Sequence, residues 1–449
     1  MRTLFFAVLL SFLAANAFSQ EDSLRKKDVE DKIKTGWTFG ALPVVAYDSD
    51  LGLKYGGLVN FYNYGDGQTY PEYLHSIYLE VSRTTKGSGI NQLFFDSEHL
   101  FEKPIRVTGD LSYLTEKALD FYGFNGYESA YNIAFEDDAE SRYKSRMYYR
   151  HERSILRFTM DFQGKLFHEN FRWLAGIAHF NYKIGSVDID ALNEGKDPED
   201  LLPDTVSLYD EYAAWGIIPE AEADGGIVNY IKLGTVYDTR DNEALPMKGM
   251  WSEVLVTTAP KFLGNSENAY TKLGAIHRQY FTLVPKKLSF AYRIGYQGTI
   301  SGEAPFYMQP YLLSSYSPSV IAEGLGGAKS VRGILRNRIV GDAIAYGNFE
   351  FRWKFFKTII KNQNLYLALS AFSDMGTVLT PIDIDRDALP SGLALEDYFD
   401  ESEDELHISY GAGLHIALNE NFIIAIDYGR PVDKRDGSSG LYIGMNFLF

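Results

Sequence analysis

The last nine residues of the chain (441–449) constrain its fold more than any other stretch. Every odd position in this stretch is apolar: Leu441, Ile443, Met445, Phe447 and Phe449. Alternation with a period of two is typical of an extended strand with one apolar face. A sandwich-core strand is one interpretation, but an unpaired apolar strand at a sheet edge invites aggregation. In a transmembrane barrel, the last strand instead closes against the first and its apolar face contacts lipid.

The N-terminal residues have the features of a secretory signal peptide. Arg2 supplies positive charge, residues 4–13 are apolar, and residues 15–19 offer small side chains for cleavage. A membrane-spanning helix needs about 20 apolar residues, and neither this segment nor any later one reaches that length. We therefore expect residues 1–19 to be a signal peptide, residues 20–35 a short periplasmic segment, and residues 36–449 a transmembrane β-barrel.

Composition agrees with a barrel in an outer membrane. Aromatic residues make up 15% of the chain, with 32 Tyr, 30 Phe and 40 Gly, as expected for aromatic girdles and a crowded lumen. The net charge of −17 disfavours nucleic acid as a partner. The chain has no Cys, which excludes disulfides and thiolate metal sites.

The pattern of alternating segments predicts an all-β fold, a 16-stranded antiparallel transmembrane β-barrel. The candidate strands lie near 36–46, 51–63, 73–83, 89–98, 104–115, 147–167, 171–186, 226–240, 249–259, 267–283, 287–299, 343–355, 363–376, 405–416, 421–430 and 440–449. Connections after the even-numbered candidates are short, whereas four of the others are long: 116–146, 187–225, 300–342 and 377–404. Tight periplasmic turns and long outer loops are typical of bacterial outer-membrane barrels.

Two of the long loops are strongly acidic. Residues 188–224 hold twelve Asp or Glu and one Lys, and residues 383–404 hold nine acidic residues and one Arg. Cation-bridged contact with lipopolysaccharide, capture of a divalent ion, and simple solubility are all consistent with this charge. The spacing matches no calcium-binding loop, so we assign no metal and no cofactor.

The loop at 321–342 (IAEGLGGAKSVRGILRNRIVGD) suggests a family. Its Gly-rich run lacks the helix of a phosphate-binding loop. The tripeptide Val331-Arg332-Gly333 instead resembles the Val-Arg-Gly motif of the BamA/TamA outer-membrane assembly factors, the bacterial surface antigen superfamily. The resemblance implies a loop that folds back into the barrel, where its arginine contacts acidic residues of the wall. The family usually has an aromatic residue where this chain has Ile334. The resemblance therefore does not predict, for this chain, the contact that the aromatic ring makes in the family.

Two acidic residues face the lumen by parity and are the expected partners of Arg332. The apolar face of the strand at 343–355 contains Phe351 and Trp353, which places Glu350 inside. Asp374 faces inward in the next strand, within Phe372-Ser373-Asp374-Met375-Gly376, which resembles the family's Phe-x-Asp-x-Gly motif. A guanidinium between two carboxylates would hold the loop through charge-assisted hydrogen bonds.

A second motif lies between the strands at 226–240 and 249–259. It consists of Asp238, Arg240, Asp241, Asn242, Pro246 and Gly249. This spacing resembles the family's strand–turn–strand signal, and we interpret it as a structural periplasmic turn because Asp and Asn cap their own backbone. The family carries periplasmic POTRA domains before its barrel. Only residues 20–35 precede the first predicted strand here, too few for a separate core, so we expect a barrel-only member.

The functional hypothesis is outer-membrane protein assembly, insertion or translocation through a lateral seam between the first and last strands. Gly36, Gly40, Gly440 and Gly444 would weaken pairing at that seam, and an aromatic ending such as Phe447 to Phe449 is usual in proteins sent to the bacterial outer membrane. The expected partners are lipid and lipopolysaccharide, with client proteins or accessory lipoproteins. The alternative is a pore or structural barrel whose inner loop narrows the lumen.

An enzyme is the third hypothesis and the least supported one. A phospholipase needs a converging serine, histidine and acid or amide, and the eight His are scattered along the chain. His179 with Ser186, or His407 with Ser409, could be brought together only by assumption. We therefore predict no catalytic residues.

Overall fold

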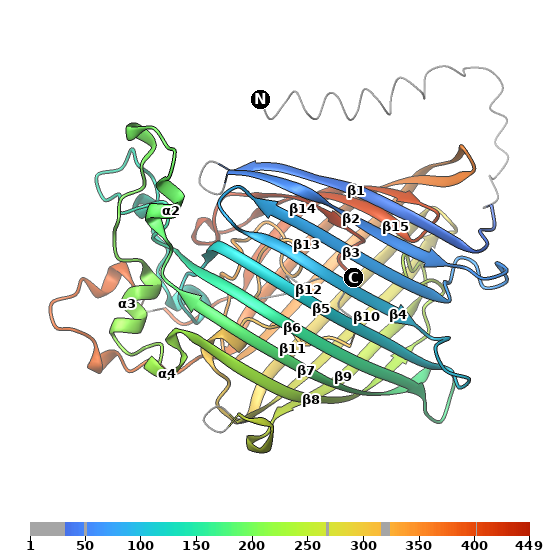
Figure 1. Ribbon diagram of the computed structural model, residues 1–449, viewed down its shortest axis with the longest axis horizontal. Helices are drawn as coiled ribbons and strands as arrows, with labels where there is room; N and C mark the ends of the chain where they lie inside the picture. Colours follow the sequence, from blue (N-terminus) through green and yellow to red (C-terminus); the bar gives the residue numbers. More distant parts are fainter. Residues whose placement is uncertain (1–31, 49–51, 266–268, 316–323, 401) are drawn as a thin grey trace.

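The computed structural model describes residues 32–48, 52–265, 269–315, 324–400 and 402–449. The predicted signal peptide lies outside these residues, as does most of the predicted periplasmic segment. Sixteen strands form one sheet in which each strand pairs antiparallel with its neighbours in sequence (Figure 1), which confirms the predicted fold class.

The first eight strands are β1 (Trp37–Asp48), β2 (Gly52–Asn63), β3 (His75–Thr84), β4 (Gly89–Ser97), β5 (Ile105–Asp120), β6 (Arg150–Lys165), β7 (Phe171–Gly185) and β8 (Gly225–Asp238). The others are β9 (Gly249–Ala259), β10 (Tyr270–Val284), β11 (Leu288–Gly302), β12 (Ala343–Ile360), β13 (Gln363–Thr380), β14 (His407–Leu418), β15 (Phe422–Pro431) and β16 (Gly440–Met445).

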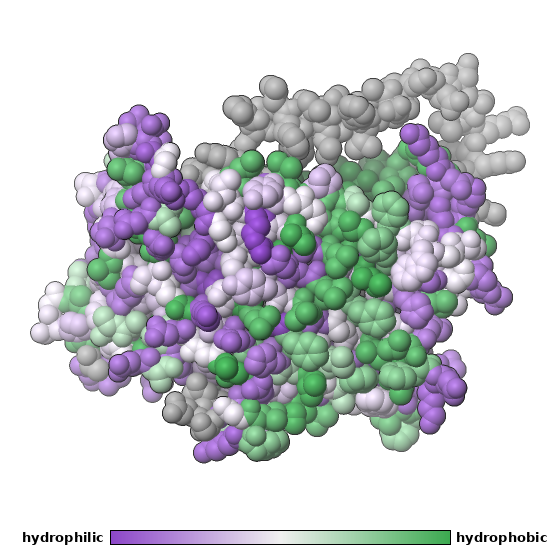
Figure 2. Space-filling view, viewed as in Figure 1, coloured by the Kyte–Doolittle hydropathy of each residue, from purple (hydrophilic) through white to green (hydrophobic). Residues whose placement is uncertain are grey.

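The two faces of the sheet differ in chemistry, as period-two strands require. Outward side chains such as Phe351, Trp353 and Leu369 are exposed and apolar, and apolar side chains gather over the strands in Figure 2. Inward side chains include the buried polar groups Arg293, Glu350 and Asp374. This is the pattern of a sheet that contacts lipid outside and encloses a polar lumen. None of the helices in the described residues is both long and apolar enough to cross a membrane.

The long loops pack together into a cap at one end of the barrel (Figure 1). The cap contains α2 (Ile189–Asn193), α3 (Leu208–Ala214) and α4 (Glu220–Ala223). Its core is mainly aromatic and joins four connections, with buried Phe121, Tyr148, Tyr212, Phe306 and Phe399. Buried aromatic area of this kind stabilises loops that would otherwise be solvated. Some acidic residues of the loops make hydrogen bonds inside the cap. Glu211 accepts hydrogen bonds from Tyr148 (2.7 Å) and Tyr398 (3.1 Å).

The last strand differs from the prediction. β16 ends at Met445, four residues before the end of the predicted strand, because Asn446 takes a left-handed backbone conformation with φ of 66°. The chain then turns inward, so Phe447 and Phe449 are buried in the lumen instead of facing lipid. Leu441 and Ile443 remain exposed as predicted.

The closure of the barrel also differs from the prediction. Among the described residues, β1 and β16 share no hydrogen-bonded ladder, so the expected pairing of first and last strands is wrong. The lumen-side face of β1 and β2 instead covers the outer face of β15. Leu58 and Tyr62 pack against Phe422, and the ring of Phe422 fills the space beside Gly40, where a Cβ would lie 2.2 Å from it. Side-chain packing therefore replaces backbone pairing at the periplasmic end of the seam.

Candidate functional site

The loop between β11 and β12 enters the lumen and forms a compact finger, residues 324–342. Leu325 pairs with Ile339 through a β-bridge, and the Ser330 hydroxyl donates to Gly324 O (2.8 Å) while it accepts from Gly326 N (2.9 Å). Leu325, Val331 and Ile339 pack together. Gly376 of β13 makes room for them, because a Cβ there would lie 2.9 Å from Leu325. The finger thus has its own core and a matching hollow in the wall.

Arg332 projects from this finger onto the wall formed by β12–β15. Its Nε and backbone N–H donate to Asp374 Oδ2 at 2.8 and 3.0 Å, and its Nη2 donates to Asp374 Oδ1 at 3.1 Å. Nη2 also donates to Glu350 Oε2 at 3.0 Å. The side chain of Arg332 is 1% exposed and those of both acids are 0% exposed. The structure therefore brings together the three residues that the sequence analysis paired.

Two further groups complete this cluster. Arg332 Nη1 donates to Asp427 Oδ2 of β15 at 3.3 Å, and the guanidinium lies over the ring of Phe372 at 3.5 Å. Asp427 lies outside the sequence motifs, although it shares the inward parity of Ala425 and Gly429. Gly333 follows with φ of 89°, and a Cβ there would lie 2.6 Å from Arg430 N. We call Arg332, Glu350, Asp374 and Asp427 the Arg332 cluster.

The Arg332 cluster continues to the inward-turned C-terminal residues. Arg352 Nε donates to Glu350 Oε1 at 3.1 Å, and its Nη2 donates to Phe449 O at 2.7 Å. The same guanidinium lies 4.6 Å from the centre of the Phe447 ring and 4.8 Å from that of Phe449. The last residues of the chain are thus connected to the finger through one arginine and one carboxylate.

Gly440 and Gly444, the predicted seam glycines of the last strand, have different surroundings. A Cβ on Gly440 would lie 2.1 Å from the hydroxyl of Tyr442, which in turn accepts a hydrogen bond from Gly333 N at 2.9 Å. Gly444 has open space apart from Lys329 Nζ at 3.9 Å. Gly440 therefore accommodates a residue that contacts the finger, whereas a Cβ on Gly444 would meet no close neighbour.

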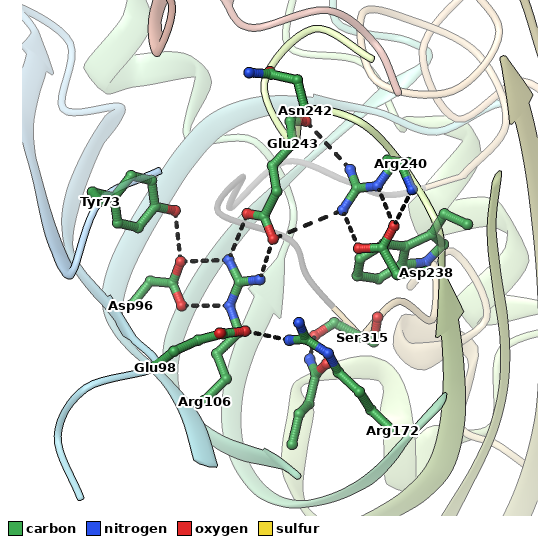
Figure 3. A network of polar contacts seen from close by, with 12 residues as sticks. Tyr73, Asp96, Glu98, Arg106, Arg172, Asp238, Arg240, Asn242, Glu243 and Ser315 are labelled. Atoms are coloured by element: carbon green, nitrogen blue, oxygen red, sulfur yellow. Dashed lines mark hydrogen bonds and ion pairs between the residues drawn. The ribbon is translucent and has the colours of Figure 1, made fainter. Parts of the chain in front are cut away.

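The motif between β8 and β9 forms a turn with its own polar network (Figure 3). Asp238 Oδ1 accepts from Arg240 N (3.0 Å) and Nε (2.9 Å), and Asn242 Oδ1 accepts from Leu245 N (2.8 Å). Asp241 Oδ1 accepts from Met247 N at 2.9 Å. Pro246 is buried. Gly249 has φ of 96°, and a Cβ there would lie 2.1 Å from Thr239 O. These contacts are those of a capped turn.

The turn also reaches across the lumen. Glu243 accepts from Arg106 of β5 at 2.7 and 3.0 Å, and Arg106 donates to Asp96 of β4 at 2.7 and 2.8 Å (Figure 3). On the other side, Leu245 packs in a cluster with Ile423 of β15 and Phe447. We call Asp96, Arg106, Asp238, Arg240 and Glu243 the turn cluster. Glu243 and Arg106 were not predicted from the sequence, because neither belongs to the motif.

The structure does not bring together the histidines and serines that were considered for an enzyme. His179 Nδ1 lies 2.7 Å from Asn229 Oδ1, whereas Ser186 donates to Asp210 at 2.5 Å. His407 lies between Asp404 (2.8 Å) and Asp436 (2.6 Å). A different pair, Ser252 and His277, is in contact at 2.7 Å, with Tyr292 as the second neighbour of the ring (3.3 Å).

The fold and the finger define a class of protein, a 16-stranded membrane barrel whose lumen is occupied by an outer loop held on an arginine. The sequence profile of the Omp85 superfamily domain matches residues 75–449, and the chain belongs to this superfamily. Barrels of this superfamily are bacterial outer-membrane proteins. None of the curated proteins matches the chain.

Two solved structures illustrate the likeness. CdiB from Escherichia coli is 11% identical, with a TM-score of 0.51 over 92% of this chain and 61% of its own. BamA from Haemophilus ducreyi lacking POTRA domains 1–3 is 16% identical, with a TM-score of 0.48 over 92% of this chain and 69% of its own. At these identities, the likeness to CdiB concerns the fold alone.

Proposed function

We propose that this barrel inserts or translocates other outer-membrane proteins through the seam between β1 and β16. The observation that carries the proposal is the absence of a ladder between these two strands in the described residues. Each strand therefore has an edge with backbone N–H and C=O groups that could pair with an incoming strand. Separating the side chains that pack at the periplasmic end of the seam costs less free energy than breaking a complete backbone ladder.

The contents of the lumen support this function over that of an open pore. The finger and the β8–β9 turn both extend into the lumen, where they contact the β12–β15 wall. A substrate that leaves sideways into lipid does not need a wide axial channel. A large and steady conductance of the wild-type protein in planar bilayers would contradict the proposal and favour the pore.

The overlap of β1 over β15 provides a direct test, since the chain has no Cys of its own. Gly40 and Phe422 are close enough that Gly40→Cys with Phe422→Cys should form a disulfide across the seam. A photo-crosslinking residue in place of the exposed Leu441 reports on whatever polypeptide enters the seam. We expect crosslinked adducts in native outer membranes, loss of these adducts when the disulfide forms, and their return after reduction.

A second disulfide serves as the control. Ala371 and Ala412 lie opposite each other on β13 and β14, away from the seam, and both are exposed. Ala371→Cys with Ala412→Cys should leave the adducts unchanged. Adducts that persist under the seam disulfide, or that never form, would contradict transport through the seam.

A further inference from the structure

A groove of about 650 Å³ lies at the outer rim of the barrel, at the outer ends of β14 and β15. One wall is formed by residues 131–133 of the cap, and the other by Pro431 at the end of β15 and by residues 432–435, 437 and 438 of the β15–β16 connection. Its floor includes Tyr410 and Arg430, which lie opposite each other on β14 and β15. Both face away from the lumen, because the alternate residue Asp427 contacts Arg332 inside. The groove therefore opens on the lipid side, at the level of the outer leaflet.

The groove has two cations without an ionic partner. Arg430 and Lys434 are exposed, and neither side chain makes a hydrogen bond or ion pair with any other residue that the structure describes. The single acid in the lining, Asp433, is already neutralised by Arg435, whose Nη2 lies 2.9 Å from Asp433 Oδ2. A chain with a net charge of −17 thus has locally positive charge at this place.

The same groove has exposed apolar surface. Ile133, Tyr410 and Val432 are 63%, 54% and 66% exposed. Tyr428 follows Tyr410 toward the membrane centre on the same outer face and is also exposed. Cations above a strip of aromatic and aliphatic side chains match an amphiphile with an anionic head group and acyl chains.

We propose that this groove binds the phosphorylated head group of an outer-leaflet glycolipid of the lipid A type. Arg430 and Lys434 donate hydrogen bonds to phosphate oxygens, and a guanidinium can do so in a bidentate manner. The acyl chains then lie along Tyr410 and Tyr428. This site is separate from the proposed transport through the seam, and it does not use the acidic loops, whose charge repels phosphate.

The test compares the full-length protein in nanodiscs with a variant in which both cations are reversed, Arg430→Glu with Lys434→Glu. The ligands are bis-phosphorylated lipid A, dephosphorylated lipid A and phosphatidylglycerol, and native mass spectrometry measures how much of each is retained. We expect the wild type to retain the bis-phosphorylated form best. Loss of two cations near a membrane surface should lower that retention by about tenfold or more.

Two further variants keep the result interpretable. Lys261→Glu reverses an exposed lysine of the β9–β10 connection, at the same end of the barrel but outside the groove, and should leave retention unchanged. Arg430→Gln with Lys434→Gln removes charge without adding any, and should give a smaller loss than the reversal. Equal retention by the wild type and the reversed variant would overturn the proposal. So would equal retention of the phosphorylated and dephosphorylated forms, or phosphatidylglycerol bound as tightly as lipid A.

Discussion

The Arg332 cluster and the turn cluster both use arginine and carboxylates to hold an inserted segment, but their surroundings differ. Arg332 and its partners Glu350 and Asp374 are at most 1% exposed. In the turn cluster, Arg106 is 5% exposed whereas Glu243 is 37% exposed. The finger enters from the outer side and the turn from the periplasmic side, and both contact the wall formed by β12–β15.

The difference in burial implies a difference in how strongly each cluster constrains the barrel. A buried charge that loses its partner cannot be rescued by water, whereas a partly exposed one can. The Arg332 cluster also has one guanidinium facing three carboxylates, so removing the arginine takes this partner from Asp374 and Asp427, while Glu350 keeps Arg352. We therefore expect the finger to be held more firmly than the turn. Substitutions at four places test whether the burial of an ion pair ranks its contribution to stability.

The largest effect is expected from Arg332→Ala. It leaves Glu350, Asp374 and Asp427 facing one another, and loss of one member of a buried ionic group costs about 3–5 kcal/mol. We expect a lower free energy of unfolding in urea and a higher leak conductance, because the finger is released. Arg332→Lys, which keeps the charge without the planar fork, should lie between wild type and Arg332→Ala. If Arg332→Ala has the urea midpoint and the leak conductance of the wild type, Arg332 does not hold the finger in place.

The second effect separates the two aspartates of the Arg332 cluster. Asp374 accepts from three N–H groups of Arg332 at 2.8 to 3.1 Å, whereas Asp427 accepts from one at 3.3 Å. Asp374→Asn should therefore destabilise the barrel by about 2 kcal/mol and Asp427→Asn by less than about 1 kcal/mol. Urea unfolding of both variants in the same detergent gives the comparison. The reverse order would show that bond geometry does not set the strength of this cluster.

The third effect concerns the turn cluster and depends on pH. Burial alone would raise the pKa of Glu243, but Arg106 outweighs it and lowers the pKa from 4.5 to about 2. A lowered pKa stabilises the folded state above pH 4.5, and this contribution is lost as pH falls toward 2. Glu243→Gln should cost about 1 kcal/mol at pH 7, and its unfolding midpoint should converge with that of the wild type as the pH falls. A difference that stays constant with pH would mean that the ion pair with Arg106 contributes no stability.

The smallest effect is expected on the surface of the cap. Arg142 contacts Asp397, yet its side chain is 50% exposed. Exposed ion pairs contribute little, because water solvates both charges when the pair is broken. Arg142→Ala should therefore have a urea midpoint that is indistinguishable from that of the wild type. A loss comparable to that of Glu243→Gln would show that burial does not rank these clusters.

The inserted segments show how far sequence reasoning reaches. Parity placed Glu350 and Asp374 in the lumen, because a strand repeats every two residues whatever its neighbours are. The same rule applies to Asp427 on β15, which the motifs did not indicate. The inward turn at Asn446 was not predicted, since one left-handed residue reversed the direction of Phe447 and Phe449 without changing the apolar pattern. Glu243 was missed because its partner Arg106 is 137 residues away.

The amino-acid sequence by itself determined the number of strands, the side that residues within the strands face and the segregation of long and short connections. These features follow from local periodicity and turn chemistry, which need no knowledge of distant residues. Only the tertiary structure decided how the two ends of the sheet meet, with β1 and β2 over the outer face of β15 in place of a ladder. It also decided that the loops share one aromatic core and that Asp427 joins Arg332. Such contacts depend on the path of the whole chain in space, and a pattern confined to one strand cannot specify them.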